Sequence, residues 1–124
     1  MAHTVLVVDD DAVIVESLRK ILSNAGYGVA VAGDGSSALQ VVRAEPVDAV
    51  LLDLVMPRLD GIKTLRYLRQ IRPDLAVVIL AADIGTEARR AALEYGAAVV
   101  MLKPPDIEEL LRVIERLVSA ESGD

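Results

Sequence analysis

The sequence contains no cysteine, no tryptophan and no phenylalanine. Disulfide bonds, thiolate nucleophiles and cysteine-based metal sites are therefore excluded. Three tyrosines are the only aromatic residues, so the core must be aliphatic, and stacking of single-stranded bases on aromatic side chains is disfavoured. The single histidine, His3, lies near the N-terminus, which argues against a mechanism that needs a histidine base in the core.

Positive charge is scarce as well. The chain has 13 Lys and Arg residues against 19 Asp and Glu residues, which gives a formal net charge of -6. This balance disfavours nucleic acid as a direct partner, because binding to a phosphate backbone requires a basic face. No hydrophobic run is long enough to span a membrane, and the N-terminus lacks the pattern of a signal peptide. We expect a cytoplasmic protein that meets cations or other proteins.

The sequence is rich in aliphatic residues, with 53% hydrophobic residues in a chain of 124. This length suits one domain with one core. Short runs rich in β-branched residues alternate with longer stretches whose apolar residues recur at helical spacing. The short runs predict strands at residues 4–8, 28–32, 48–53, 76–81 and 98–102. The longer stretches predict helices at residues 11–26, 34–45, 60–72, 86–96 and 106–120.

The strict alternation of strands and helices predicts an α/β fold with a parallel sheet, right-handed crossovers and helices on both faces. The near-continuous apolar character of the strands agrees, because both faces of such a sheet are covered. Asp11 is placed to cap the first helix, and Gly26 is placed to end it. We expect a single domain over residues 1–124, with a core at about 4–118 and a loose tail at 119–124.

Polar side chains stand at the predicted carboxyl ends of several strands. Asp9 and Asp10 follow the first strand. Asp53 ends the third strand inside an otherwise apolar run, and Lys103 follows the fifth. Ligands of an open parallel sheet bind beyond these ends, so the fold would collect the four side chains at one edge. Taken singly, each Asp is more often a cap or turn residue and the lysine an ordinary surface residue, but their convergence favours a common site.

This combination of side chains has a chemical preference. Clustered carboxylates repel one another, which raises their pKa values unless a cation is present. Mg²⁺ is the natural occupant, because it is a hard cation that takes carboxylate, water and phosphate oxygens as ligands, and Mn²⁺ could substitute for it. A lysine beside the carboxylates adds a positive charge suited to a phosphoryl oxygen. The sequence therefore predicts phosphoryl chemistry, with an Asp as covalent acceptor as one option.

Three segments together point to a family. They are "VLVVDDD" at residues 5–11, "VLLDLVMPRLDG" at residues 50–61 and "LKPPD" at residues 102–106. At these spacings, on alternating strands and helices, the chain resembles the receiver domain of two-component response regulators, in particular the chemotaxis receivers, from roughly Thr4 to Val118. The resemblance implies a doubly wound, flavodoxin-like sheet with strand order 2-1-3-4-5.

The resemblance also implies a role for each matching residue. Asp53 would accept the phosphoryl group, and Lys103 would contact it. Asp9, Asp10 and Asp53 would hold Mg²⁺ together with the backbone carbonyl of Val55. The donor would be a sensor histidine kinase, a phosphotransfer protein or a small phosphodonor, and the chain would be a signalling phosphoacceptor rather than an enzyme. The Lys103–Pro104 bond is expected to be cis. The residues expected to shape the loop after Asp53 are Met56, Pro57, Asp60 and Gly61.

Other positions depart from the family pattern. The hydroxyl residue that usually ends the fourth strand and bonds a phosphoryl oxygen is here Ala81, and the usual aromatic residue of the fifth strand is Val100. Both halves of the usual conformational switch are therefore absent. Drift in an aliphatic core is one reading, but we favour a receiver whose signal travels by another route, because Lys103 and the acidic residues are retained. Pro105 replaces a common Phe, and Asp83 suits orienting a water and capping a helix equally well.

The resemblance places the partner-binding surface on the predicted helix 86–96, strand 98–102 and helix 106–120. Charges of both signs at helical spacing suit a solvated face, a contact with a downstream protein or a homodimer, and the sequence does not decide among them. The residues concerned are Arg89, Arg90, Glu94, Tyr95, Glu108, Glu109, Arg112, Glu115 and Arg116.

Other functions compete with phosphoryl-dependent signalling. A degenerate receiver would act as a protein-interaction module without phosphorylation, which Ala81 and Val100 favour and the intact acidic cluster opposes. A metal-dependent phosphohydrolase would use an Asp nucleophile after the first strand. Asp9 and Asp11 have the spacing for this, but the chain has no room for a cap domain over the substrate. A flavodoxin-like cofactor binder would need a phosphate-binding loop and aromatic residues around a flavin, which the sequence lacks.

Overall fold

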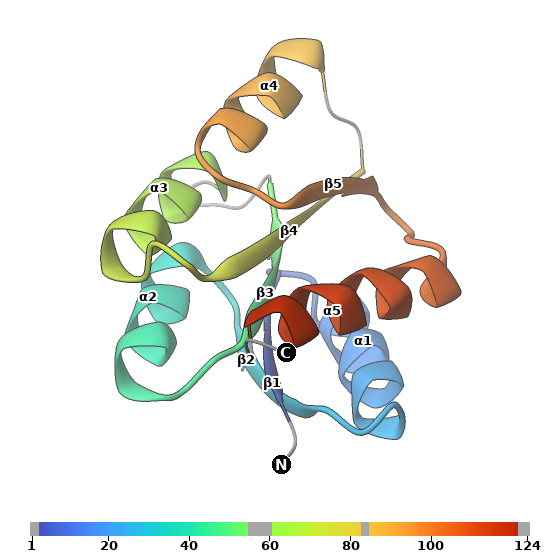
Figure 1. Cartoon of the computed structure of the whole chain (residues 1–124). Helices are drawn as coiled ribbons and strands as arrows, with labels where there is room; N and C mark the ends of the chain where they lie inside the picture. Colours follow the sequence, from blue (N-terminus) through green and yellow to red (C-terminus); the bar gives the residue numbers. More distant parts are fainter. Residues whose placement is uncertain (1–2, 55–60, 83–84, 122–124) are drawn as a thin grey trace.

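A computed structural model of the chain describes residues 3–54, 61–82 and 85–121 (Figure 1). Its strands are β1 (Thr4–Val8), β2 (Gly28–Ala32), β3 (Ala49–Asp53), β4 (Ala76–Ala81) and β5 (Val99–Leu102). Its helices are α1 (Ala12–Asn24), α2 (Gly35–Ala44), α3 (Gly61–Ile71), α4 (Thr86–Glu94) and α5 (Ile107–Glu121). Neighbouring strands pair in parallel in the order β2-β1-β3-β4-β5. This confirms the predicted α/β fold and the strand order that the resemblance implies.

The sheet has an apolar layer on each face, because successive side chains of a strand point to opposite sides. Val5 and Val7 of β1 pack in the layer under α1 and α5, whereas Leu6 and Val8 pack in the layer under α2, α3 and α4. Figure 1 shows α1 and α5 together on one side of the sheet. The buried hydrophobic residues of the described chain are all aliphatic or methionine. No described helix is both long and apolar enough to cross a membrane.

All helix ends except the start of α4 differ from the predicted ones by one or two residues, and the caps explain several of these differences. Asp11 lies just outside α1 as its N-cap, where its side chain accepts hydrogen bonds from the Val13 and Ile14 amides. Gly26 and Gly96 have φ angles of 99° and 97°, which lie in the left-handed region. The predicted helices 11–26 and 86–96 therefore end too late, because a right-handed helix stops before such a residue. The predicted strands 48–53 and 98–102 each begin one residue early.

One arginine joins the end of α3 to the turn between α4 and β5. The Arg69 guanidinium donates to the backbone carbonyls of Pro73 and Gly96, both at 2.9 Å, and to that of Arg72 at 3.4 Å. It also donates to the Leu75 carbonyl. A charged donor forms stronger bonds than a neutral one, so this side chain holds two loops that are far apart in sequence.

We predict that Gly96→Ala destabilises the fold more than Gly26→Ala. Both glycines have a positive φ, so each substitution should cost about 1–2 kcal/mol of backbone strain. A Cβ at Gly26 would meet nothing within 4 Å, but one at Gly96 would lie 2.5 Å from the Arg69 Nε. The displaced arginine would lose bonds to carbonyls, each worth about 1.5–3 kcal/mol. Urea unfolding should show this extra loss.

The excess should disappear when Arg69 is replaced. In an Arg69→Met background, Gly96→Ala and Gly26→Ala should cost about the same, because only backbone strain is left. An excess that persists without Arg69 would contradict the steric cause.

Candidate functional site

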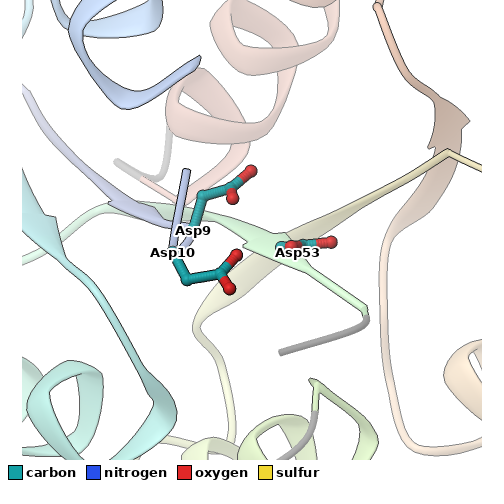
Figure 2. A group of neighbouring side chains, drawn as sticks. All are labelled: Asp9, Asp10 and Asp53. Atoms are coloured by element: carbon teal, nitrogen blue, oxygen red, sulfur yellow. The ribbon is translucent and has the colours of Figure 1, made fainter. Parts of the chain in front are cut away.

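Three carboxylates meet at the carboxyl edge of the sheet. β1 and β3 are paired with Val8 opposite Leu52, so the residues that follow Val8 lie beside the end of β3. One carboxylate oxygen each from Asp9, Asp10 and Asp53 lies within 4.8 Å of the others, and Figure 2 shows the three side chains converging. Asp9 and Asp53 are 4% and 7% exposed, whereas Asp10 is exposed. The structure therefore brings Asp9, Asp10 and Asp53 together at this edge, where the sequence predicted them to meet.

Lys103 joins the cluster from the carboxyl end of the edge strand β5. Its Nζ donates to Asp9 Oδ2 at 2.6 Å and lies 3.3 Å from Asp53 Oδ1. Its backbone amide donates to the Ala81 carbonyl at 2.8 Å, which sets where the side chain starts. The bond to Pro104 is cis, as predicted. Burial alone lowers the pKa of the Lys103 ammonium, but the bond to Asp9 and the charge of Asp53 outweigh it, so the pKa is raised.

The donor set fits a hard divalent cation. The two Asp9 oxygens are already engaged, because Oδ1 accepts from the Asp11 amide at 2.9 Å and Oδ2 accepts from Lys103. Asp10 is exposed and sits at the open side of the cluster. Carboxylate oxygens that share a small space and carry more negative charge than one ammonium can balance are the ligands that Mg²⁺ or Mn²⁺ take in proteins.

The loop after Asp53 is only partly described. Val55, Met56, Pro57 and Asp60 lie outside the described residues, as does Asp83. Gly61 is described, and its amide donates to the Leu54 carbonyl at 2.9 Å. A Cβ on Gly61 would lie 2.5 Å from both Cα and O of Leu54 and 2.6 Å from the carbonyl oxygen of Asp53. Only a residue without a side chain can therefore start α3 this close to the site.

Ala81 and Val100, which depart from the family pattern at the usual switch positions, lie on the same face of the sheet. Ala81 is 1% exposed in the apolar layer under α2, α3 and α4, and Val100 packs against that layer. Asp53 lies opposite Leu80 in the pairing of β3 with β4, so Ala81 is one residue beyond it. Both side chains are thus accommodated in an aliphatic core near the site.

An apolar groove beside the site was not predicted. It has a volume of about 480 Å³, lies between α1 and the start of α5, and includes Lys103 in its lining. Among its lining residues are Val13, Ile14, Pro105 and Ile107. Val13 is 75% exposed and contributes apolar surface to this groove. The sequence offered one sign of this groove, because Val13 is an apolar residue outside the buried stripe of α1.

The fold and the site define a doubly wound α/β protein with an acidic centre and a lysine at the carboxyl edge of its sheet. The chain belongs to the response regulator receiver domain family, whose model, described as "Response regulator receiver domain", matches residues 5–115.

Several relatives support this assignment. The chain is 42% identical over 124 residues to "Response regulator MprA" of Mycolicibacterium vanbaalenii, covering 100% of this chain and 54% of that protein. It is 42% identical over 120 residues to the protein of the same name from Mycobacterium leprae, covering 97% of this chain and 53% of that protein. The chain therefore spans about half the length of the curated relatives it matches.

Solved structures agree with the assignment. A CheY-like response regulator receiver domain protein from Methanospirillum hungatei has a TM-score of 0.95 at 25% identity, covering 99% of this chain and 98% of that one. The receiver domain of the Francisella response regulator 1452 has a TM-score of 0.89 at 33% identity, covering 96% of this chain and 98% of that one.

Proposed function

We propose that Asp53 is the phosphoryl acceptor of a two-component signalling receiver, in a reaction that depends on Mg²⁺. The observation that carries this proposal is the placement of the Lys103 Nζ 3.3 Å from Asp53 Oδ1, beside two further carboxylates. Asp9, Asp10 and Asp53, with the Val55 carbonyl, are the proposed metal ligands. The chain is proposed to be a cytoplasmic signalling phosphoacceptor, not an enzyme acting on other substrates, with its domain core at about residues 4–118.

The proposed transfer is a single displacement at phosphorus. A carboxylate oxygen of Asp53 forms a P–O bond while the P–N bond of a phosphohistidine breaks, and the leaving imidazole takes a proton from water. With a small acyl phosphate as donor, the P–O bond to a carboxylate leaving group breaks instead. Lys103 would hold a phosphoryl oxygen by a charge-assisted bond. Mg²⁺, if held by these ligands, would neutralise negative charge on the phosphoryl oxygens.

Intact mass spectrometry tests this function. The protein is incubated with acetyl phosphate and Mg²⁺, with an EDTA-treated sample and Asp53→Asn as controls. We expect one phosphoryl adduct in the wild type with Mg²⁺ and none in either control. An adduct that survives in Asp53→Asn would place the acceptor elsewhere. Absence of an adduct, even with a kinase, would favour a phosphorylation-independent interaction module, and phosphoester turnover lost only in Asp9→Asn would favour the phosphohydrolase.

The signal is further proposed to travel without the usual switch, because Ala81 offers no hydroxyl and Val100 no aromatic ring. Ala81→Ser should restore a donor at the family's hydroxyl position. A hydrogen bond to a charged group is worth about 1.5–3 kcal/mol, so affinity for the phosphoryl analogue beryllofluoride should rise about tenfold or more with Mg²⁺ present. Isothermal titration calorimetry gives this affinity.

Ala81→Cys is the control for Ala81→Ser. It adds a group of similar size whose S–H is a weak donor, so its beryllofluoride affinity should stay near that of the wild type. Equal affinities for the serine and cysteine variants would show that residue 81 does not reach the phosphoryl group.

The apolar groove beside Lys103 is proposed as the contact for the protein donor, a sensor histidine kinase or phosphotransfer protein. It adjoins the acceptor and exposes Val13 and Ile107, which a docked protein could bury. Val13→Glu would place a charge in this apolar contact. We expect transfer from a phosphorylated donor protein to slow by about tenfold, corresponding to about 1.4 kcal/mol of lost binding.

Phosphorylation by acetyl phosphate should be unchanged in Val13→Glu, because the small donor needs no groove. Leu93→Glu on α4 is the matched control, since Leu93 is also exposed, at 44%, but lies outside the groove. Equal slowing by the two variants would contradict this assignment.

The surface of α4, β5 and α5 is proposed to contact the downstream partner and to allow a homodimer. Three large apolar side chains are exposed there, Leu93 at 44%, Tyr95 at 39% and Leu102 at 60%. Exposed apolar patches often mark protein contacts, so these three side chains are the proposed contact residues of this surface. No direct contact of these residues with nucleic acid or membrane is proposed.

A further inference from the structure

The apolar groove between α1 and the start of α5 has a nearly uniform lining. Apart from Ser17 and Lys103, every residue that lines it has an aliphatic side chain or is a proline. Pro104 and Pro105 also lack a backbone N–H, so this wall offers no amide donor at either position. The volume of about 480 Å³ lies within the range of about 300–1,000 Å³ that is typical of small-molecule sites. The groove therefore suits an apolar group rather than a polar one.

The floor of the groove lies below the molecular surface. Leu18 of α1 and Leu80 of β4 belong to its lining, although they are only 4% and 3% exposed. Val13 and Ile107 also line it, and their exposed fractions of 75% and 36% place them at its rim. A docked protein could cover the rim, whereas a narrow hydrocarbon chain can enter between the walls. The depth of the groove is thus a feature that a small ligand can use.

The groove adjoins the proposed phosphoryl acceptor. Leu80 lies opposite Asp53 in the pairing of β3 with β4. Lys103 gives the second link, because it lines the groove and its Nζ lies 3.3 Å from Asp53 Oδ1. A ligand whose phosphoryl group reaches Asp53 therefore has an apolar surface beside it for the rest of the molecule.

We propose that the small phosphodonor preferred by this chain is an acyl phosphate with a longer hydrocarbon chain than acetyl phosphate, and that the groove binds this chain. The inference rests on the proposed phosphorylation of Asp53. A carboxylate oxygen of Asp53 forms a bond to phosphorus, the bond between phosphorus and the acyl oxygen breaks, and the acyl group leaves as a carboxylate anion. The charged phosphoryl end faces Lys103, and the chain replaces water in the groove. A docked protein donor would cover the same groove, so the two donors exclude each other.

The dependence of phosphoryl uptake on chain length tests the proposal. Acetyl, butyryl and hexanoyl phosphate are compared at equal, subsaturating concentrations with Mg²⁺, by the growth of the adduct in intact mass spectra. Their carboxylate leaving groups are nearly equal in basicity, so the donors differ mainly in the chain. Full burial of one methylene strengthens binding about fourfold, and an open groove buries only part of each, so hexanoyl phosphate should react about tenfold faster than acetyl phosphate. Butyryl phosphate should lie between them.

Two double variants locate the chain. Val13→Ser/Ile107→Ser removes apolar surface from the groove, so the ratio of the hexanoyl rate to the acetyl rate should fall to about twofold or less. Val31→Ser/Leu93→Ser makes the same kind of change at side chains that are 46% and 44% exposed outside the groove, and it should keep the wild-type ratio. Val31 is a close control, because it lines a separate pocket together with Asp9 and Asp10.

Binding without reaction gives a second readout. Hexanoylphosphonate has a P–C bond in place of the P–O bond that breaks, so it cannot transfer its phosphoryl group. With Mg²⁺ present, it should shift the methyl NMR signals of Val13, Ile14 and Ile107, all of which line the groove. Acetylphosphonate, which lacks the longer chain, should leave these methyl signals in place.

The possible outcomes separate this inference from the proposed function. Equal rates for the three donors in the wild type would overturn the inference but leave phosphorylation of Asp53 standing. An equal fall of the rate ratio in both double variants, or NMR shifts on another face, would overturn it in the same way. Absence of an adduct from every donor would overturn the proposed function and this inference together.

Discussion

Lys103→Met is expected to slow phosphoryl uptake at Asp53 by about 100-fold, the usual loss when one charge-stabilising donor is removed from a reacting centre. The Lys103 Nζ lies 3.3 Å from Asp53 Oδ1, so it can reach an oxygen of a phosphoryl group arriving there. Methionine has a similar length but no charge and no donor. The rate is measured with acetyl phosphate and saturating Mg²⁺, by the growth of the adduct in intact mass spectra.

The Mg²⁺ affinity of Lys103→Met shows whether the variant has lost only the lysine contact with the phosphoryl group or the whole metal site. The Lys103 ammonium competes for Asp9 Oδ2, to which it donates at 2.6 Å, so its removal should leave Mg²⁺ affinity equal or higher. Calorimetry is the suitable method, since the chain has no tryptophan to report binding by fluorescence. Lys20→Met, at an exposed lysine of α1, should change neither the rate nor the affinity. A Lys103→Met protein that is phosphorylated at the wild-type rate would remove this lysine from the proposed reaction.

Gly61→Ala is expected to cost about 3 kcal/mol of unfolding free energy, at the upper end of what overpacking usually costs. The new methyl group would lie 2.5 Å from two Leu54 backbone atoms and 2.6 Å from the Asp53 carbonyl oxygen. Backbone atoms cannot rotate aside as a flexible side chain can, so the start of α3 or the end of β3 must move. The shift should also reduce phosphorylation, because Asp53 belongs to the displaced segment. Urea unfolding followed by circular dichroism measures the loss of stability.

Gly33→Ala is the control for Gly61→Ala. A Cβ at Gly33 would meet no heavy atom within 4 Å, and its φ is ordinary, so the substitution should be close to neutral. Similar unfolding midpoints for the two variants would mean that α3 does not approach Leu54 as closely as the structure shows.

The strands and the acidic site could be predicted because each depends on a strong local signal. Strands buried on both faces must be apolar, so the departure at Asp53 stood out within its run. The position of Asp9 and Asp10 at the same edge followed from parallel pairing, not from side-chain detail. The strand order came only from the resemblance to receivers, because alternation of strands and helices allows several orders.

The contacts that depend on side-chain torsions could not be predicted. Nothing in the spacing of Lys103 shows that it bonds Asp9 more closely than Asp53. The bonds of Arg69 were hidden for the same reason, because helical periodicity gives only its side of the helix. The prediction could have ended the helix before Gly96, since a glycine after a helix commonly adopts a left-handed conformation.

The Lys103–Asp9 bond has a mechanical consequence. Lys103 follows the edge strand β5, and Asp9 follows β1, with β3 and β4 between them. The Lys103 ammonium thus links the edge strand β5 to the interior strand β1 through Asp9, and Asp53 Oδ1 lies 3.3 Å from the same nitrogen. In the proposed chemistry, added negative charge on Asp53 would attract the Lys103 ammonium away from Asp9 and weaken the link between β5 and β1. The edge strand would then sense the modification through its own lysine, with no contribution from the side chain of residue 81.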